Sequence, residues 1–289
     1  MITVVLNAFK RQHYLRNQID CVLSQTLPAQ QVMIWNNGDP LDLQGFGDRV
    51  MLANHSDNLG VWSRFAYALN AETEYVCVLD DDTFPSPRFF ESCLREMNRQ
   101  PALLGARGLR FLSNSRYHPF VSFGWDAPNE KTELVDIVGH AWFFKREWLG
   151  VFWRDLPPLD TTRLVGEDMH FSFMLQKYLS IPTKVPPHPN TDLSVWGSNP
   201  ELAIQLGTSK EAVSQSEDAL RKFDKALKRC TENGFQLCKD LEVTESSAVL
   251  IGPGVTRIHW LKELASRYPK FGEWGRSIQH KLRERNIHI

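Results

Sequence analysis

The chain has 289 residues, 42% of them hydrophobic, which suits one large α/β domain or a domain with a smaller appendage. Its 33 Lys and Arg residues against 34 Asp and Glu residues leave a net charge of -1, which argues against a general nucleic-acid binder. The 5 cysteines are scattered, with no zinc-ligand spacing, and no apolar run approaches a membrane span. We therefore expect a cytoplasmic protein with reduced thiols, attached at most to a membrane surface.

Short apolar runs alternate with helical patterns over the first hundred residues. A helix is expected at 12–25, because Leu15, Ile19 and Val22 share one face of that segment. This alternation predicts a largely parallel sheet with helices on both faces. The expected strands lie within 2–9, 30–37, 48–55 and 74–82, and the further helices within 61–72 and 86–100.

Polar residues follow three of these strands. Asn7 follows the first strand, Asn36 and Asn37 follow the second, and an Asp triplet follows the strand "YVCVL". The carboxyl ends of parallel strands meet at one edge of a sheet, where ligands of such folds bind. We therefore predict a functional site at this edge.

The pattern changes after residue 100. Strands mix with one clear helix that begins near Glu167, and beyond Pro200 the chain reads as mainly helical, with an amphipathic stretch over 209–230. A boundary is expected there, with a catalytic-type domain over 1–199 and a helical C-terminal extension over 200–289.

The triplet Asp80, Asp81 and Asp82 suggests a metal site. In an extended segment alternate side chains point the same way, so Asp80 and Asp82 would share one cavity while Asp81 points elsewhere. Paired carboxylates suit Mg²⁺ or Mn²⁺, which also take phosphate oxygens. The alternative is a turn or helix-capping cluster, since a helix follows the triplet.

Five short motifs stand in an order that resembles a known group of enzymes. "NAFKRQHYL", "VMIWNNGD", "LDDDT", "GHAWFF" and "GEDMHFSF" occur as in nucleotide-sugar glycosyltransferases of the GT-A fold. The general pattern is similar to family 2, whereas "WNN" and the DDD-T triplet resemble exostosin-type transferases. The resemblance covers roughly residues 1–195 and implies a GT-A domain, a Rossmann-like, mostly parallel sheet flanked by helices.

The resemblance implies roles for the residues at the predicted edge. Asp82 would be the main metal ligand, Asp80 would lie near the ribose or the metal, and Arg64 would face the diphosphate. The cofactor would be Mn²⁺ or Mg²⁺. The alternative for Arg64 is an exposed helix charge. The nucleotide-sugar-binding set would be Asn7, Arg11, Asn36, Asn37, Asn58, Arg64, Asp80 and Asp81.

Glu167 and Asp168 form a second carboxylate site at the start of a helix. In the resembling enzymes an acidic pair here reaches the acceptor side, which makes Asp168 and Glu167 the expected catalytic residues. An inverting enzyme needs a base to deprotonate the acceptor hydroxyl, whereas a retaining enzyme could use the acid to stabilise positive charge. Sequence leaves both outcomes open, and a capping acid is the simpler alternative.

Two histidines and two tryptophans complete the expected site. His188, in "VPPHPN", would complete the metal shell, with an exposed loop histidine as the alternative. His140, Trp142 and Trp196 would border the acceptor or sugar, with packing in the core as the alternative.

Together these features predict a metal-dependent hexosyltransferase. It would move a sugar from a nucleotide-diphosphate donor, a UDP-sugar, to a glycan, lipid-linked or protein acceptor. The alternatives are a sugar-nucleotide nucleotidyltransferase, disfavoured because "VVLNAFKRQHYL" has no glycine, and a non-catalytic sugar-binding or scaffold protein. The basic C-terminus offers peripheral membrane contact, against the simpler reading of a solvated helix.

Overall fold

The computed structural model describes residues 1–43, 47–155, 164–200, 217–241 and 249–251. The chain divides into two compact units, Met1–Val249 and Leu250–Ile289, and the description below concerns the first. This unit includes helix α8 (Glu217–Glu232), which lies after the predicted boundary at residue 199. That boundary stays a prediction, as does the basic C-terminal segment, which lies outside the described residues.

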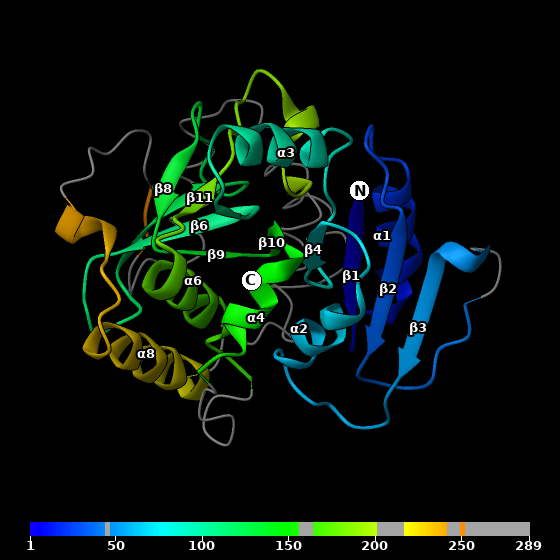
Figure 1. The fold of residues 1–289 in the computed structure, drawn as a ribbon, viewed down its shortest axis with the longest axis horizontal. Helices are drawn as coiled ribbons and strands as arrows, with labels where there is room; N and C mark the ends of the chain where they lie inside the picture. The colour runs from blue at the N-terminus through cyan, green and yellow to red at the C-terminus, as the bar shows by residue number, and fades with distance from the viewer. Residues whose placement is uncertain (44–46, 156–163, 201–216, 242–248, 252–289) are drawn as a thin grey trace, which may run out of the picture. The chain divides into compact units, whose positions relative to one another are not determined.

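The main sheet has eight strands in the order β3-β2-β1-β4-β10-β5-β11-β8 (Figure 1). The first four strands of that order run parallel, whereas β10 is antiparallel to β4 with Ala141 opposite Leu79. The strands are β1 (Ile2–Ala8), β2 (Gln31–Asn36), β3 (Val50–Asn54), β4 (Tyr75–Leu79), β5 (Leu103–Leu104), β8 (Glu133–Val135), β10 (Ala141–Lys145) and β11 (Thr183–Val185).

A smaller antiparallel sheet lies beside the main one. Its central strand β6 (Arg107–Phe111) pairs with β7 (Phe120–Gly124) on one side and β9 (Ile137–Gly139) on the other. One more short strand, β12 (Val249–Ile251), comes at the end of the described chain.

Helices pack on both faces of the main sheet because each presents an apolar stripe. On α1, Leu15, Ile19 and Val22 are buried, as the sequence pattern predicts. The α-helices are α1 (Leu15–Leu23), α2 (Ser63–Tyr67), α3 (Phe89–Arg99), α4 (Leu149–Phe152), α6 (Glu167–Leu179) and α8; short 3-10 turns are η1 (Gln12–Tyr14), η2 (Gly47–Arg49), η3 (Ala68–Asn70), η4 (Arg146–Trp148), η5 (Leu193–Val195) and η7 (Cys238–Leu241).

An aromatic core ties α2, α4 and α6 to β10. Phe65 stacks on Phe152 with ring centroids 4.9 Å apart, and Phe171 meets Phe144 edge to face at 4.9 Å. All four rings are fully buried, and each contributes roughly 1.5–3 kcal/mol by leaving water. This core fixes the helices that carry Arg64 and the Glu167–Asp168 pair.

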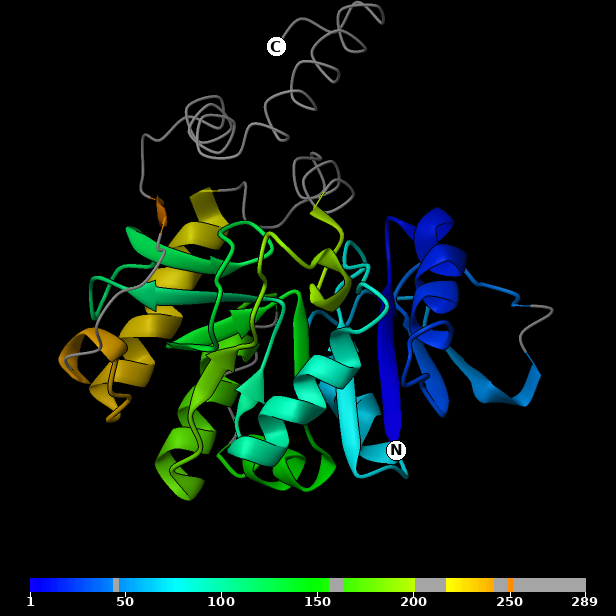
Figure 2. The same cartoon turned by 90° about the horizontal axis from the view of Figure 1, so that it is seen from above.

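The predicted α/β architecture is therefore confirmed, with strands and helices in the expected order through residue 100. Beyond Pro200, α8 confirms a helix that overlaps the amphipathic stretch and lies beside α6 (Figure 2). Among the described residues no helix has the length and apolar character needed to cross a membrane.

Candidate active site

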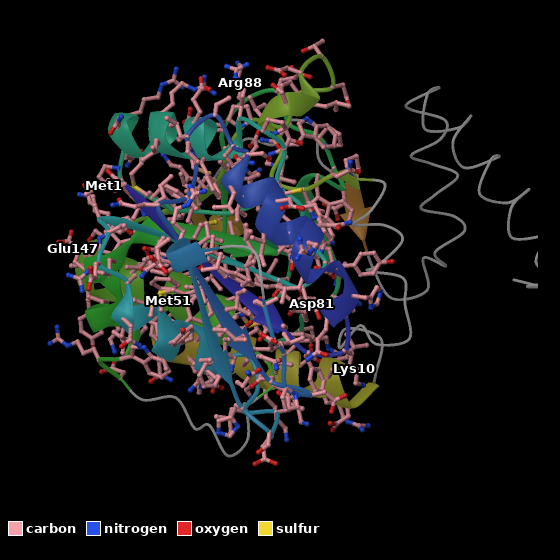
Figure 3. The ribbon with its side chains drawn as sticks, turned by 90° about the vertical axis from the view of Figure 1, so that its right-hand side faces the viewer. Met1, Lys10, Met51, Asp81, Arg88 and Glu147 are labelled. Atoms are coloured by element: carbon pink, nitrogen blue, oxygen red, sulfur yellow. The ribbon has the colours of Figure 1, made fainter. Side chains whose placement is uncertain are left out.

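The predicted site lies at the carboxyl edge of the parallel strands. Figure 3 shows Lys10, which follows β1, and Asp81, which follows β4, on the side opposite Met1. Asn37 also belongs to this edge, because its backbone N–H donates to the carbonyl of Ala8 at 2.8 Å. The polar strand endings thus converge, as the sequence predicts.

The Asp triplet forms a turn and not the extended segment that was expected. The backbone N–H of Thr83 donates to the carbonyl of Asp80 at 3.1 Å, which closes the turn. Gln18 on α1 clamps it, since its Nε2 donates to the carbonyls of Asp80 at 2.7 Å and Thr83 at 2.9 Å. This turn nevertheless brings the carboxylates of Asp80 and Asp82 within 4.8 Å of one another, and a shared cavity stays a prediction.

Asp80, Asp82 and His140 form the metal-type cluster of the described residues. One ligand atom from each lies within 4.8 Å of the others. His140 Nδ1 is 3.3 Å from Asp82 Oδ1. Two carboxylates and one imidazole are a donor set that divalent cations accept, so the residues present fit Mn²⁺ or Mg²⁺.

The electrostatics of the cluster favour positive charge. Burial lowers the pKa of His140, but the Asp82 carboxylate outweighs this and raises that pKa above its ordinary value. Burial likewise raises the pKa of Asp82, and His140 and Arg11 together bring it below the ordinary value. The carboxylate of Asp82 thus stabilises the protonated form of His140, and a metal cation bound here would replace that proton.

His140 occupies its position through an unusual backbone. Its φ of 62° lies in the left-handed region, which few residues other than glycine adopt, although His, Asn and Asp do so more often than the rest. Its carbonyl accepts the N–H of Asp80 at 3.0 Å, and the Trp125 ring meets its imidazole edge to face at 5.3 Å. Backbone strain of this kind concentrates at functional sites.

Arg11 secures the other side of the triplet. Its Nη1 lies 2.7 Å from Asp81 Oδ1 and 3.3 Å from Asp82 Oδ2, and the side chain is buried. Burial and the charge of Asp82 raise the pKa of Asp81 to about 6, although Arg11 acts in the opposite direction. Arg11 thus holds the turn, and its predicted contact with a nucleotide sugar stays a prediction.

Arg64 joins the two carboxylate sites that the sequence treats separately. Its guanidinium pairs with Asp80 on one side and with Glu167 on the other, the latter at 2.7 Å. The side chain is only 2% exposed, so it is not the exposed helix charge considered as an alternative. Its Cζ lies 4.5 Å from the centroid of the Trp142 ring, which is itself buried.

Asp168 is the second residue of α6 and has a different environment from Glu167. Gly166 precedes the helix at φ 89°, and Asp168 Oδ1 accepts the backbone N–H of Met169 at 2.7 Å. Burial and the neighbouring charge of Glu167 raise the pKa of Asp168 to about 8. A carboxyl that titrates near neutral pH has the property required of a general base.

The Asn36 amide is fully occupied inside the protein. Its Oδ1 accepts from Gln12 at 2.8 Å and from the Gly38 N–H at 3.2 Å. Its Nδ2 donates to the Asp39 carbonyl at 2.7 Å and to Asn54 at 2.8 Å. An amide offers two donors and two acceptor positions, so contact with a base would require one of these bonds to break.

The other asparagines are less committed. Asn37 Oδ1 accepts from Trp35 Nε1 at 2.8 Å, while its Nδ2 lies 3.5 Å from Asn7 Oδ1. Asn58 is exposed and accepts the Gly60 N–H at 2.8 Å, which closes a turn. The nucleotide-binding roles of these asparagines stay predictions.

His188 and Trp196 lie in a buried loop outside the cluster. The ring nitrogens of His188 lie 2.8 Å from the Pro186 carbonyl and 2.9 Å from the Gly197 N–H. Trp196 Nε1 donates to the Pro189 carbonyl at 2.8 Å. The structure thus brings His140 to the carboxylates and leaves His188, the expected third ligand, to hold its loop.

The fold and site define a class of protein. A mostly parallel sheet with an acidic turn after β4, beside an antiparallel β10, is consistent with the GT-A fold of glycosyltransferases. Residues 3–153 match the sequence model of Glycosyl transferase family 2. This is more than half of the 289 residues, and the chain belongs to that family. A search of curated proteins gave no match. The exostosin-type resemblance stays a prediction.

Proposed function

We propose that this protein is a metal-dependent glycosyltransferase that moves a hexose-type sugar from a nucleotide-diphosphate donor, a UDP-sugar, to the hydroxyl of a glycan, lipid-linked or protein acceptor. The observation that carries the proposal is the pairing of Arg64 with both Asp80 and Glu167. The Arg64 side chain thus lies between the metal-type cluster, through Asp80, and the first turn of α6, through Glu167.

Asp80, Asp82 and His140 would hold the cation, either Mn²⁺ or Mg²⁺. When bound, such a cation offsets the charge that develops on a diphosphate leaving group. Asn7, Arg11, Asn37, Asn58 and Asp81 are proposed to surround the nucleotide from the same sheet edge. Asn36 would support these residues without touching the nucleotide itself. Its own amide is already bonded to Gln12, Gly38, Asp39 and Asn54.

Asp168 is proposed as the base of the chemical step. The acceptor O–H gives its proton to the Asp168 carboxylate while the oxygen bonds to the anomeric carbon. The bond from that carbon to the diphosphate oxygen breaks, and the diphosphate leaves with the electron pair. Attack opposite the leaving group inverts the anomeric centre, which is the outcome that a base at this position supports.

Glu167 has a supporting part in this proposal. Its carboxylate pairs with the Arg64 guanidinium and is buried, so it is not free to take a proton from an acceptor. Its charge instead raises the pKa of Asp168. Glu167 would thus make its neighbour a better base.

The experiment is a screen of nucleotide sugars by thermal shift, with and without Mn²⁺, followed by an assay of nucleotide release. A ligand that binds only the folded state raises the melting temperature by mass action. We expect a UDP-sugar to raise it in Mn²⁺ and to do so much less in chelator. UDP release that depends on Asp168 would then distinguish an enzyme from a sugar-binding scaffold.

The screen can also contradict the proposal. If a UDP-sugar raises the melting temperature equally with and without Mn²⁺, the cluster has no role in holding a metal for donor binding. Release of pyrophosphate from a sugar phosphate and UTP, without transfer to an acceptor, would instead support a nucleotidyltransferase.

A further inference from the structure

Helix α8 lies beyond the family match yet contacts the start of α6. The family match ends at residue 153, whereas α8 spans Glu217–Glu232. A Cβ placed on Gly166, the residue before Glu167, would lie 3.0 Å from the Cβ of Ala226 on α8. The two helices therefore pack at the very residue that leads into the Glu167–Asp168 pair.

Helix α8 also holds the segment before β7. The Tyr117 ring stacks on Phe223 with centroids 4.7 Å apart and planes at 24°. Asp224 accepts the backbone N–H of Tyr117 at 2.7 Å, and the Thr231 hydroxyl donates to the Asn114 carbonyl at 2.7 Å. One helix thus fixes two parts of the chain that are far apart in sequence.

Helix α8 brings Tyr117 and the start of α6 together, because Tyr117 stacks on Phe223 and Gly166 lies against Ala226, three residues further along the same helix. After burial, the charge of Asp168 is the largest cause that raises the pKa of the Tyr117 phenol, ahead of Glu167. The ring is also packed by Phe111 and Phe120, with centroids 5.4 Å away in both cases. The residue is half-buried, so part of it keeps contact with solvent.

We propose that α8 is a positioning element of the active site, which holds Tyr117 and the first turn of α6 so that the Tyr117 hydroxyl binds a polyhydroxylated acceptor beside Asp168. The acceptor part rests on the proposed function. Phe223 is then a positioning residue, since it acts through Tyr117, and Tyr117 is the residue that contacts the acceptor. A phenol suits this task because it combines a rigid apolar ring with one polar group.

The first test measures hydrogen exchange in Phe223→Ala, with no ligand needed. The informative amides are Tyr117, which donates to Asp224, and His170, which donates to the Gly166 carbonyl at 3.0 Å. We expect both to exchange about tenfold faster or more, because local opening becomes easier when the stacked ring is lost. Phe223→Tyr should restore the parent rates.

The matched control is Phe235→Ala. Phe235 is buried in the same C-terminal segment and packs on Phe173 of α6 at 5.8 Å, away from the start of that helix. We expect this variant to lose stability but to keep slow exchange at Tyr117. Equal acceleration in both alanine variants, or none in Phe223→Ala, would overturn the positioning role of α8.

The second test concerns the acceptor. Nucleotide release from the donor found by thermal shift is measured with p-nitrophenyl glycosides as acceptor probes. Tyr117→Phe should raise the acceptor KM about fivefold, the effect of one lost hydrogen bond, and leave the donor KM unchanged. Tyr178→Phe is the control, because the Tyr178 hydroxyl bonds Asp155 at 2.6 Å on an outer face of α6.

The outcomes of the two tests are separable. An unchanged acceptor KM in Tyr117→Phe would overturn the acceptor contact. If the parent protein releases no nucleotide with any donor, the proposed function and the acceptor contact fail together, and the exchange data still decide whether α8 positions α6 and Tyr117.

Discussion

Replacing Asp168 by Asn should make the protein more stable and nearly inactive. The pKa of Asp168 is raised to about 8, chiefly by burial and then by the charge of Glu167. The folded state therefore binds this proton more tightly than the unfolded chain, where an aspartate has a pKa of about 3.9. Stability from this group is present below about pH 4 and is lost as the pH rises towards 8.

The magnitude follows from the two pKa values. At pH 7 the unfolded carboxyl is ionised and the folded one is not, which costs the native state at most about 4 kcal/mol. The Asp168 side chain is half-buried and keeps some contact with solvent. We therefore expect Asp168→Asn to raise the free energy of unfolding at pH 7 by about 2 kcal/mol. Asparagine retains an oxygen that can accept the Met169 N–H, so the cap is not lost.

The assay is urea unfolding of the protein without nucleotide or metal, at pH 4 and at pH 7. The gain should appear at pH 7 and shrink to about 0.5 kcal/mol or less near pH 4, where the parent carboxyl is protonated in the folded state and about half protonated in the unfolded chain. Asp155→Asn serves as the control, because Asp155 bonds Lys177 and Tyr178 in the last turn of α6 and not the helix start. An equal effect at both pH values would refute the electrostatic explanation.

Activity should respond in the opposite direction. We expect transfer to fall at least about a hundredfold in Asp168→Asn, since an amide cannot take the acceptor proton. In the parent, kcat/KM should rise with pH and level off above about pH 8, the pKa of Asp168. A variant that transfers sugar at the parent rate would leave Asp168 as a helix cap.

Three further predictions concern other residues of the site. His140→Gln should weaken Mn²⁺ binding in the presence of UDP at least about tenfold by calorimetry, and parent-like affinity would remove His140 from the cluster. Arg64→Met should lower the free energy of unfolding, measured in urea, by about 3 kcal/mol, because Asp80 and Glu167 lose their shared partner. A change under about 1 kcal/mol would contradict the stabilising role of these two ion pairs. Gly166→Ala should cost about 1–2 kcal/mol because φ is 89°, and an unchanged melting temperature would show that the helix start relaxes freely.

Local pattern was enough to predict the parallel half of the fold. Strand and helix periodicity give the order of β1 to β4, and the polar residues after those strands predict the site edge. Asp80 and Asp82 are only two positions apart in sequence, so their convergence follows from the chain itself, although they lie in a turn and not in a strand.

The partners of these carboxylates depend on strand pairing, which periodicity does not encode. His140 reaches Asp82, 58 residues earlier in the chain, only because β10 inserts antiparallel beside β4. Arg64 reaches Glu167 across 103 residues through the packing of α2 and α6. Gln18 did carry a signal, since it is a polar residue on the buried face of α1 next to Ile19.

The central claim is that a divalent cation on the Asp80–Asp82–His140 cluster binds the nucleotide. The most direct measurement is calorimetric titration of UDP into the parent, Asp82→Asn and Asp155→Asn proteins, each with Mn²⁺ and with chelator. We predict UDP binding in Mn²⁺ for the parent and for Asp155→Asn, weakened at least about tenfold by chelator or by Asp82→Asn. Binding of equal strength in all of these conditions would contradict the account.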